Sequence, residues 1–270
     1  MNSRPDSPLI SRIAQMLGAR LRQQRPLLIG LATTAVLWEI STFFLPAIIT
    51  PPLSDIAIAM WAIFSQADQL LHLLVTGARV LVALVVSFVV GATIGILMGT
   101  FDSVREYVKP MLHFIQGIPA LSWVIFAVIW FANVEFRIGF VLLIVTMPAF
   151  ALYIDGAVRS VNLDLVHLSQ AFRSSRLQRF RMIIIPAIIP EVISSWVVNL
   201  GAGVRVAMVA ELIGSTLGVG FQLLNAQALF DMAGAIAWTL SLVFLLSIYQ
   251  GAITFAESHL LSWRPRGEHA

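Results

Sequence analysis

Six apolar stretches dominate the sequence, and each is close to the roughly 20 residues that a helix needs to cross the hydrocarbon core of a bilayer. The pattern predicts an all-α, polytopic membrane protein with about six transmembrane helices. A single membrane domain at 27–260 is expected between polar tails at 1–26 and 261–270. The predicted spans cover residues 26–46, 78–100, 114–132, 138–158, 187–213 and 235–256.

The composition supports burial in lipid. Hydrophobic residues make up 59% of the chain and charged residues 11%, whereas a soluble domain has roughly 25% charged residues. The absence of cysteine excludes disulfides and thiolate metal sites. The five histidines are scattered without metal-ligand spacing, and no serine, histidine and carboxylate set forms a catalytic motif. Neither a metal site nor a catalytic site is therefore expected.

Two segments fit this pattern less well. Gly117 and Pro119 interrupt the third predicted span, and Asn133 ends it early. The segment from Ser54 to about Leu74 carries too many polar residues to cross lipid, so we expect it at the surface or in the interface.

The positions of the arginines and lysines predict the orientation, because cytoplasmic loops carry an excess of these residues. With both termini inside, the outside segments hold only Arg79 and Arg137, and Arg205 lies within a span. This distribution explains the pI of about 9.9 without a nucleic-acid partner. The inside segments hold Arg4, Arg12, Arg20, Arg22, Arg25, Arg105, Lys109, Arg159, Arg173, Arg176, Arg179, Arg181, Arg264 and Arg266.

Three glycines recur every fourth residue in the second predicted span: Gly91, Gly95 and Gly99. Small residues at this spacing share one helix face and let two helix backbones approach closely. We interpret them as a packing seam; a substrate path lined by small residues is the alternative.

The long basic loop from Asp155 to about Arg181 also has amphipathic helical spacing. Most connections between helices in bundles are 2–8 residues long. A loop that only fixed the topology would need the arginines but not the apolar stripe. We therefore predict that this loop docks a cytoplasmic partner.

The same loop resembles the cytoplasmic signature of binding-protein-dependent ABC importer permeases, E-A-A-x3-G-x9-I-x-L-P. Ile183, Ile185 and Pro186 match its end, and residues 174–181 are similar to the family's A-S-R-W-Q-L-F-R run. The chain departs from the signature at 167–169, where His-Leu-Ser replaces E-A-A, and at Arg173, which replaces glycine. A left-handed turn at that position would cost a side chain roughly 1–2 kcal/mol, so Arg173 predicts a different turn or a different ATPase groove.

Other segments resemble the nitrate/sulfonate/taurine branch of this family, in the family's order. They are residues 37–39 (L-W-E), 50–56 (T-P-P-L-S-D-I), 118–123 (I-P-A-L-S-W), 129–131 (I-W-F), 209–213 (V-A-E-L-I) and 218–220 (G-V-G).

The resemblance implies a multi-pass permease in the bacterial inner membrane. Its expected partners are two ATPase subunits, a second permease copy, a periplasmic or lipoprotein substrate-binding protein, and membrane lipid. No cofactor is expected on this chain, since ATP and Mg belong to the ATPase and no phosphate-binding G-x-x-x-x-G-K-[ST] loop is present. The resemblance places ATPase coupling in a loop at about 159–182, with the contact residues Asp164, Leu168, Ala171, Phe172, Arg173, Ser174, Ser175, Arg176 and Gln178.

Arg205 is a charge inside the fifth predicted span, which costs at least about 2.5 kcal/mol unless it faces protein or water. It shares a helix face with Gly201 and Met208. Two hypotheses stay open. Arg205 faces the translocation path and favours anions, or it forms an ion pair with an acid on another helix, such as Glu39 or a neighbour's Glu211.

Glu211 lies near the outer end of the same span. We interpret it as an interfacial carboxylate at a helix end, with a contribution to the translocation path as the alternative. The chain as a whole is predicted to be an importer permease for a small anion, such as a sulfonate or nitrate, that works by alternating access. An ion-coupled secondary transporter and a membrane scaffold are the alternatives.

Overall fold

The computed structural model describes residues 25–26, 28–161, 175, 178 and 180–260. The regular secondary structure of these residues is helical, with no strand among them, which confirms the predicted all-α class. Four helices are long and apolar enough to cross a membrane. They are α3 (Ala67–Thr100), α6 (Val134–Arg159), α9 (Ile185–Leu212) and α11 (Met232–Leu260).

The predicted third span, at 114–132, corresponds to a bent pair of helices rather than to one straight helix. Helix α4 (Asp102–Gly117) and helix α5 (Ala120–Trp130) meet at an angle of 91°. Pro119 lacks a backbone N–H and disfavours the helical region for the residue before it, and Ile118 is accordingly extended. Asn133 caps α6 by accepting hydrogen bonds from the N–H groups of Glu135 and Phe136.

The segment around the second predicted span also differs from expectation. Among the described residues, the first apolar stretch is helical at 25–26 and at Leu28–Ser41. The polar segment at 54–74 divides at Gln66 into a short helix α2 (Leu53–Ser65) and the first turns of α3. Helix α3 therefore begins at Ala67 rather than near residue 78.

The glycine seam is confirmed. A Cβ built at Gly95 would lie 2.5 Å from the carbonyl oxygen of Ala151, and one at Gly99 would lie 2.6 Å from the Cβ of Val158. Helices α3 and α6 therefore pack with their backbones almost in contact, which only glycine permits. The fully buried side chains of Leu84, Leu142, Phe150 and Leu200 show that the core lies among α3, α6 and α9.

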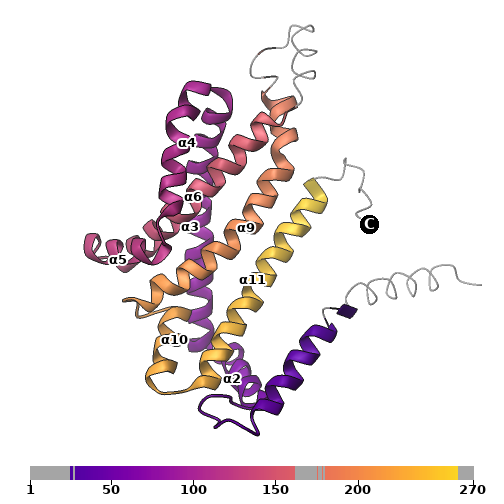
Figure 1. Cartoon of the computed structure of the whole chain (residues 1–270), viewed down its shortest axis with the longest axis vertical. Coiled ribbons are helices and arrows are strands. Elements are labelled where there is room, and N and C mark those ends of the chain that lie inside the picture. Colours follow the sequence, from indigo (N-terminus) through magenta and orange to yellow (C-terminus); the bar gives the residue numbers. More distant parts are fainter. Residues whose placement is uncertain (1–24, 27, 162–174, 176–177, 179, 261–270) are drawn as a thin grey trace, which may run out of the picture.

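Figure 1 shows α3, α6, α9 and α11 running along the long axis, with α5 lying across it. One end of the bundle carries the start of α4, the end of α6 and the π-helical turn η1 (Phe180–Ile184) before α9. The opposite end carries α10 (Val219–Ala228), the start of α6 and the end of α9. These are named the α4 end and the α10 end below.

Candidate functional site

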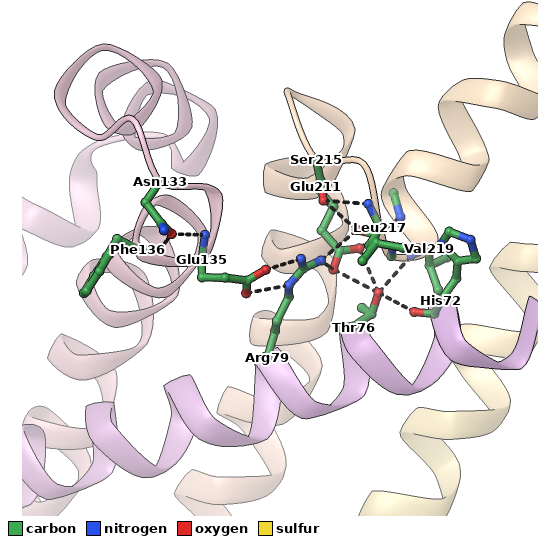
Figure 2. Close-up of polar contacts among 12 residues, drawn as sticks. His72, Thr76, Arg79, Asn133, Glu135, Phe136, Glu211, Ser215, Leu217 and Val219 are labelled. Atoms are coloured by element: carbon green, nitrogen blue, oxygen red, sulfur yellow. Dashed lines mark hydrogen bonds and ion pairs between the residues drawn. The ribbon is translucent and has the colours of Figure 1, made fainter. Parts of the chain in front are cut away.

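The most extensive polar network among the described residues lies at the α10 end and centres on Arg79 of α3 (Figure 2). Its guanidinium pairs with Glu135 of α6 through Nε and Nη2, and the Nε contact is 2.9 Å. Through Nη1 it donates to Glu211 of α9 and to the carbonyl oxygen of Leu217, each at 2.7 Å. One buried arginine thus ties three helices and a loop together.

Glu211 is enclosed on its other side. Its side chain has no solvent exposure. The Thr76 hydroxyl donates to the Glu211 carboxylate at 2.8 Å, and the backbone N–H of Gly220 donates to it at 3.1 Å. The same hydroxyl accepts a hydrogen bond from the N–H of Val219 at 2.8 Å. A buried carboxylate needs such donors and a cation, since an unpaired charge is costly away from water.

The chain folds over this carboxylate because one glycine ends the loop before α10 and another lies in the first turn of α10. Gly218 has a φ of +116°, and a Cβ there would collide with the Glu211 carboxylate. A Cβ at Gly220 would collide with the carbonyl oxygen of Met208. His72 of α3 holds the loop from the other side, accepting a hydrogen bond from the N–H of Gly218 at its Nδ1. Two segments that resemble the family separately, 209–213 and 218–220, are therefore in contact in the fold. The glycines of the second segment enclose the Glu211 carboxylate of the first.

A cavity of about 670 Å³ opens beside Arg79, between α3 and α6. Its only charged lining residues are Arg79 and Glu135, and its walls are apolar and aromatic. Arg79 is 9% exposed at its side chain and Glu135 is 63% exposed. The cavity therefore has a charged end, formed by Arg79 and Glu135, and apolar walls elsewhere.

The predicted path residues do not gather at one place. Arg205 is exposed on α9, and no ion pair to it occurs among the described residues. Its Nη1 lies 3.9 Å from the position a Gly201 Cβ would take, so the side chain extends along α9 toward Gly201. Met208 is half-buried, and Glu211 belongs to the Arg79 network. Within this chain the Glu211 carboxylate therefore pairs with Arg79 and not with Arg205.

Most of the predicted coupling residues lie outside the described part of the chain: Asp164, Leu168, Ala171, Phe172, Arg173, Ser174 and Arg176. Ser175 and Gln178 are described, and they bond reciprocally. The N–H of Ser175 donates to Gln178 Oε1 at 2.8 Å, and the N–H of Gln178 donates to Ser175 Oγ at 3.2 Å. This is a capping box, and the spacing S-x-x-Q could have indicated it from the sequence.

A second ionic cluster lies at the α4 end. Asp155, with a side chain 3% exposed, accepts from Arg105 at 3.0 Å and from Arg159 at 3.2 Å. Arg159 also pairs with Asp102 and donates to the carbonyl oxygen of Met98 at 3.2 Å. The sequence reading assigned Asp155 to the cytoplasmic loop, but α6 continues to Arg159 and buries this carboxylate in the helix bundle.

Sequence reasoning did not single out Thr76, His72 or Glu135, and it counted Arg79 only as an outer basic residue. A charge directly after the expected start of an apolar span is a signal that could have found Arg79, because such charges need partners.

Comparison with known proteins identifies the family. A family model described as "Binding-protein-dependent transport system inner membrane component" matches residues 91–260, well over half of the chain. The chain belongs to this family. It is 28% identical over 212 residues to the taurine transport system permease protein TauC of Escherichia coli (strain K12), covering 75% of this chain and 77% of TauC. It is also 28% identical over 235 residues to the formylaminopyrimidine transport permease protein ThiX of Halalkalibacterium halodurans, covering 86% of this chain and 92% of ThiX.

The fold agrees with a solved member of the same transporter class. A structure of the MetNI methionine ABC transporter in inward facing conformations matches with a TM-score of 0.55 and 17% identity, covering 74% of this chain and all of that chain. The residue-based resemblance to the taurine branch is confirmed by these relatives. The chain is an integral membrane permease subunit of an ABC importer. Permeases of this family work with ATPase and substrate-binding partners.

Proposed function

We propose that this permease moves a small anion of the sulfonate type into the cytoplasm by alternating access. The observation that carries this proposal is Arg205, an exposed cation on a membrane-spanning helix. It lies seven residues before the end of α9, or about 10 Å along the helix axis. An arginine at this depth is tolerated when it faces water or a polar partner, and water beside a cation favours anionic cargo.

The relatives support this substrate class unequally. TauC is a taurine permease, and taurine is a sulfonate. ThiX is a formylaminopyrimidine permease, and its cargo is a heterocycle. The charge at Arg205 favours the anion over the heterocycle, because a guanidinium forms stronger, charge-assisted hydrogen bonds with an oxyanion than with a neutral ring.

The proposed assembly contains two copies of this permease, two ATPase subunits that bind ATP and Mg, and an external substrate-binding protein. Both termini lie in the cytoplasm, so the α4 end faces the ATPase and the α10 end faces outward. Arg105 and Arg159 lie at the α4 end, which agrees with the excess of basic residues on cytoplasmic segments. The coupling loop at about 159–182 docks in the ATPase and transmits its closure.

Uptake of radiolabelled taurine into proteoliposomes, with the ATPase and binding protein present, tests the anion assignment. Arg205→Gln should abolish uptake while the amount of folded permease in the membrane stays unchanged, and Arg205→Lys should retain uptake because the charge is kept. Loss of folded protein in Arg205→Gln would instead show that Arg205 forms a structural ion pair across the assembly.

Co-purification tests the importer assignment separately. The intact permease, extracted in gentle detergent, should retain an ATPase subunit, and replacing Phe172 and Arg176 together should release it. An intact permease that retains no ATPase would contradict the proposed coupling.

A further inference from the structure

The cavity beside Arg79 has the form of a binding site for an amphiphilic molecule. Its volume of about 670 Å³ falls in the range of 300–1,000 Å³ typical of small-molecule sites. Val82 and Val86 of α3, and Phe136, Phe140 and Leu143 of α6, make most of its wall apolar. The charged groups lie together at one end, where Figure 2 shows Glu135 and Arg79 pointing toward each other.

Glu135 occupies the position on Arg79 that an external anion would take. Its two carboxylate oxygens accept from Nε and Nη2 of the same guanidinium. This paired geometry is the one in which arginine binds carboxylates and other oxyanions most strongly. Arg79 is 9% exposed with Glu135 in place and Glu135 itself is 63% exposed, so an anion on this edge would replace a partly hydrated carboxylate.

An external anion could displace the Glu135 carboxylate from Arg79 with little change to the surrounding structure. Its side chain is 63% exposed, so it can rotate into water without opening the helix packing. Arg79 keeps Glu211 and the carbonyl oxygen of Leu217 on its other nitrogen. An incoming anion would therefore substitute one negative charge for another, and the net charge around Arg79 would not change.

We propose that Arg79 and this cavity bind an organic anion with an apolar tail. The sulfonate or carboxylate group displaces Glu135 from Arg79, and the tail lies along Val82, Val86 and Phe140. The proposal rests on the proposed function, since the α10 end is the side from which the importer receives its cargo. It assigns a solute rather than a lipid to the cavity, and it adds a site distinct from Arg205.

Binding of alkanesulfonates to the full-length permease in neutral phosphatidylcholine nanodiscs tests the charged part of the site. Glu135→Gln weakens the internal competitor, so 1-hexanesulfonate should bind about fivefold more tightly than to the unchanged protein, as expected for loss of a partly exposed ion pair. Hexylammonium, with the same tail and the opposite charge, should not gain affinity. Equal affinities of the two permeases for 1-hexanesulfonate would overturn the proposal.

The tail is tested by chain length and by a matched pair of glycines on α6. In Glu135→Gln, affinity should rise about fourfold for each added methylene from 1-butanesulfonate to 1-hexanesulfonate. Gly139 lines the cavity and Gly156 does not, and a Cβ at either would meet nothing within 4 Å. Adding Gly139→Leu should remove the dependence on chain length, whereas adding Gly156→Leu should leave it intact. A dependence that survives Gly139→Leu would place the tail elsewhere.

Two further outcomes are decisive. If nanodiscs containing phosphatidylglycerol abolish 1-hexanesulfonate binding to Glu135→Gln, the occupant is a lipid and the solute assignment is wrong. If 1-hexanesulfonate binds as described, the site stands even where Arg205→Gln fails to affect uptake, because binding is measured on the permease alone. Failure of the proposed function and failure of this site are therefore distinguishable.

Discussion

Gly218→Ala should be among the most damaging single-methyl substitutions at the α10 end. Gly218 has φ +116° and ψ 171°, a region that is nearly exclusive to glycine and costs other residues about 1–3 kcal/mol. The added Cβ would also collide with the carboxylate of Glu211, which has no exposure and pairs with Arg79. Disrupting a buried ion pair costs about 3–5 kcal/mol. The two effects together predict a loss of about 4 kcal/mol or more in the free energy of unfolding.

Gly214→Ala provides the matched control. Gly214 also has a positive φ, +95°, and lies in the same loop. Its added Cβ would lie 2.7 Å from Nη1 of Arg137, the far end of a flexible side chain that can move away. This substitution should therefore carry only the backbone cost of about 1–3 kcal/mol.

The assay is reversible unfolding in mixed micelles, with an SDS titration followed by tryptophan fluorescence. Gly218→Ala should lose at least about 2 kcal/mol more than Gly214→Ala, since only Gly218→Ala disturbs the buried pair. Equal losses in the two variants would refute the argument that Gly218 is required by Glu211, and would leave backbone conformation as the whole explanation.

Five other substitutions probe the packing, a cap and the second ionic cluster in the same unfolding assay. Gly95→Ala should destabilise by about 1–3 kcal/mol because its Cβ meets backbone. At Gly139 an added Cβ would meet nothing within 4 Å, so Gly139→Ala should instead stabilise α6 by about 0.5–1 kcal/mol. Destabilisation by both substitutions would contradict the assignment of Gly95 to a close-packed helix contact. Asn133→Ala should cost about 1 kcal/mol through loss of the α6 cap, and no change would show that the cap is replaceable. Asp155→Asn should cost about 1–3 kcal/mol because two arginines lose their shared carboxylate, whereas Asp102→Asn, 91% exposed, should be nearly neutral.

The sequence predicted those features that repeat along one helix. Apolar runs predicted the class and most of the long helices, and the four-residue glycine spacing predicted a packing seam on α3, because each signal is local to a single helix. That the seam packs against α6 is shown only by the folded structure. The 91° bend was visible only as an interruption at Gly117 and Pro119. A proline permits a break, but the direction of the following helix depends on packing that is not local.

The Arg79 network shows the opposite case. Thr76 and Glu211 are 135 positions apart, and Arg79 and Glu135 are 56 positions apart. No spacing rule connects such residues, so their pairing emerges only when α3, α6 and α9 are packed. The segment at 218–220 resembles a family motif, but its physical cause, a chain segment closed over a buried carboxylate, is visible only in the folded protein.

Helices α3 and α6 are joined on both sides of the cavity, by the Arg79–Glu135 pair toward the α10 end and by the glycine seam toward the α4 end, which bears on how the site at Arg79 can work. Arg79 pairs with Glu135 at the α10 end, the glycine seam leaves no room for sliding, and Arg159 donates to the Met98 carbonyl at the α4 end. Interfaces packed this closely do not deform gradually, so we expect the two helices to move as one body. Anion exchange at Arg79 should then proceed by rotation of the exposed Glu135 side chain, without separation of α3 from α6. The larger movements of the proposed alternating access should then fall on elements outside this pair, such as α5, which is bent 91° away from α4.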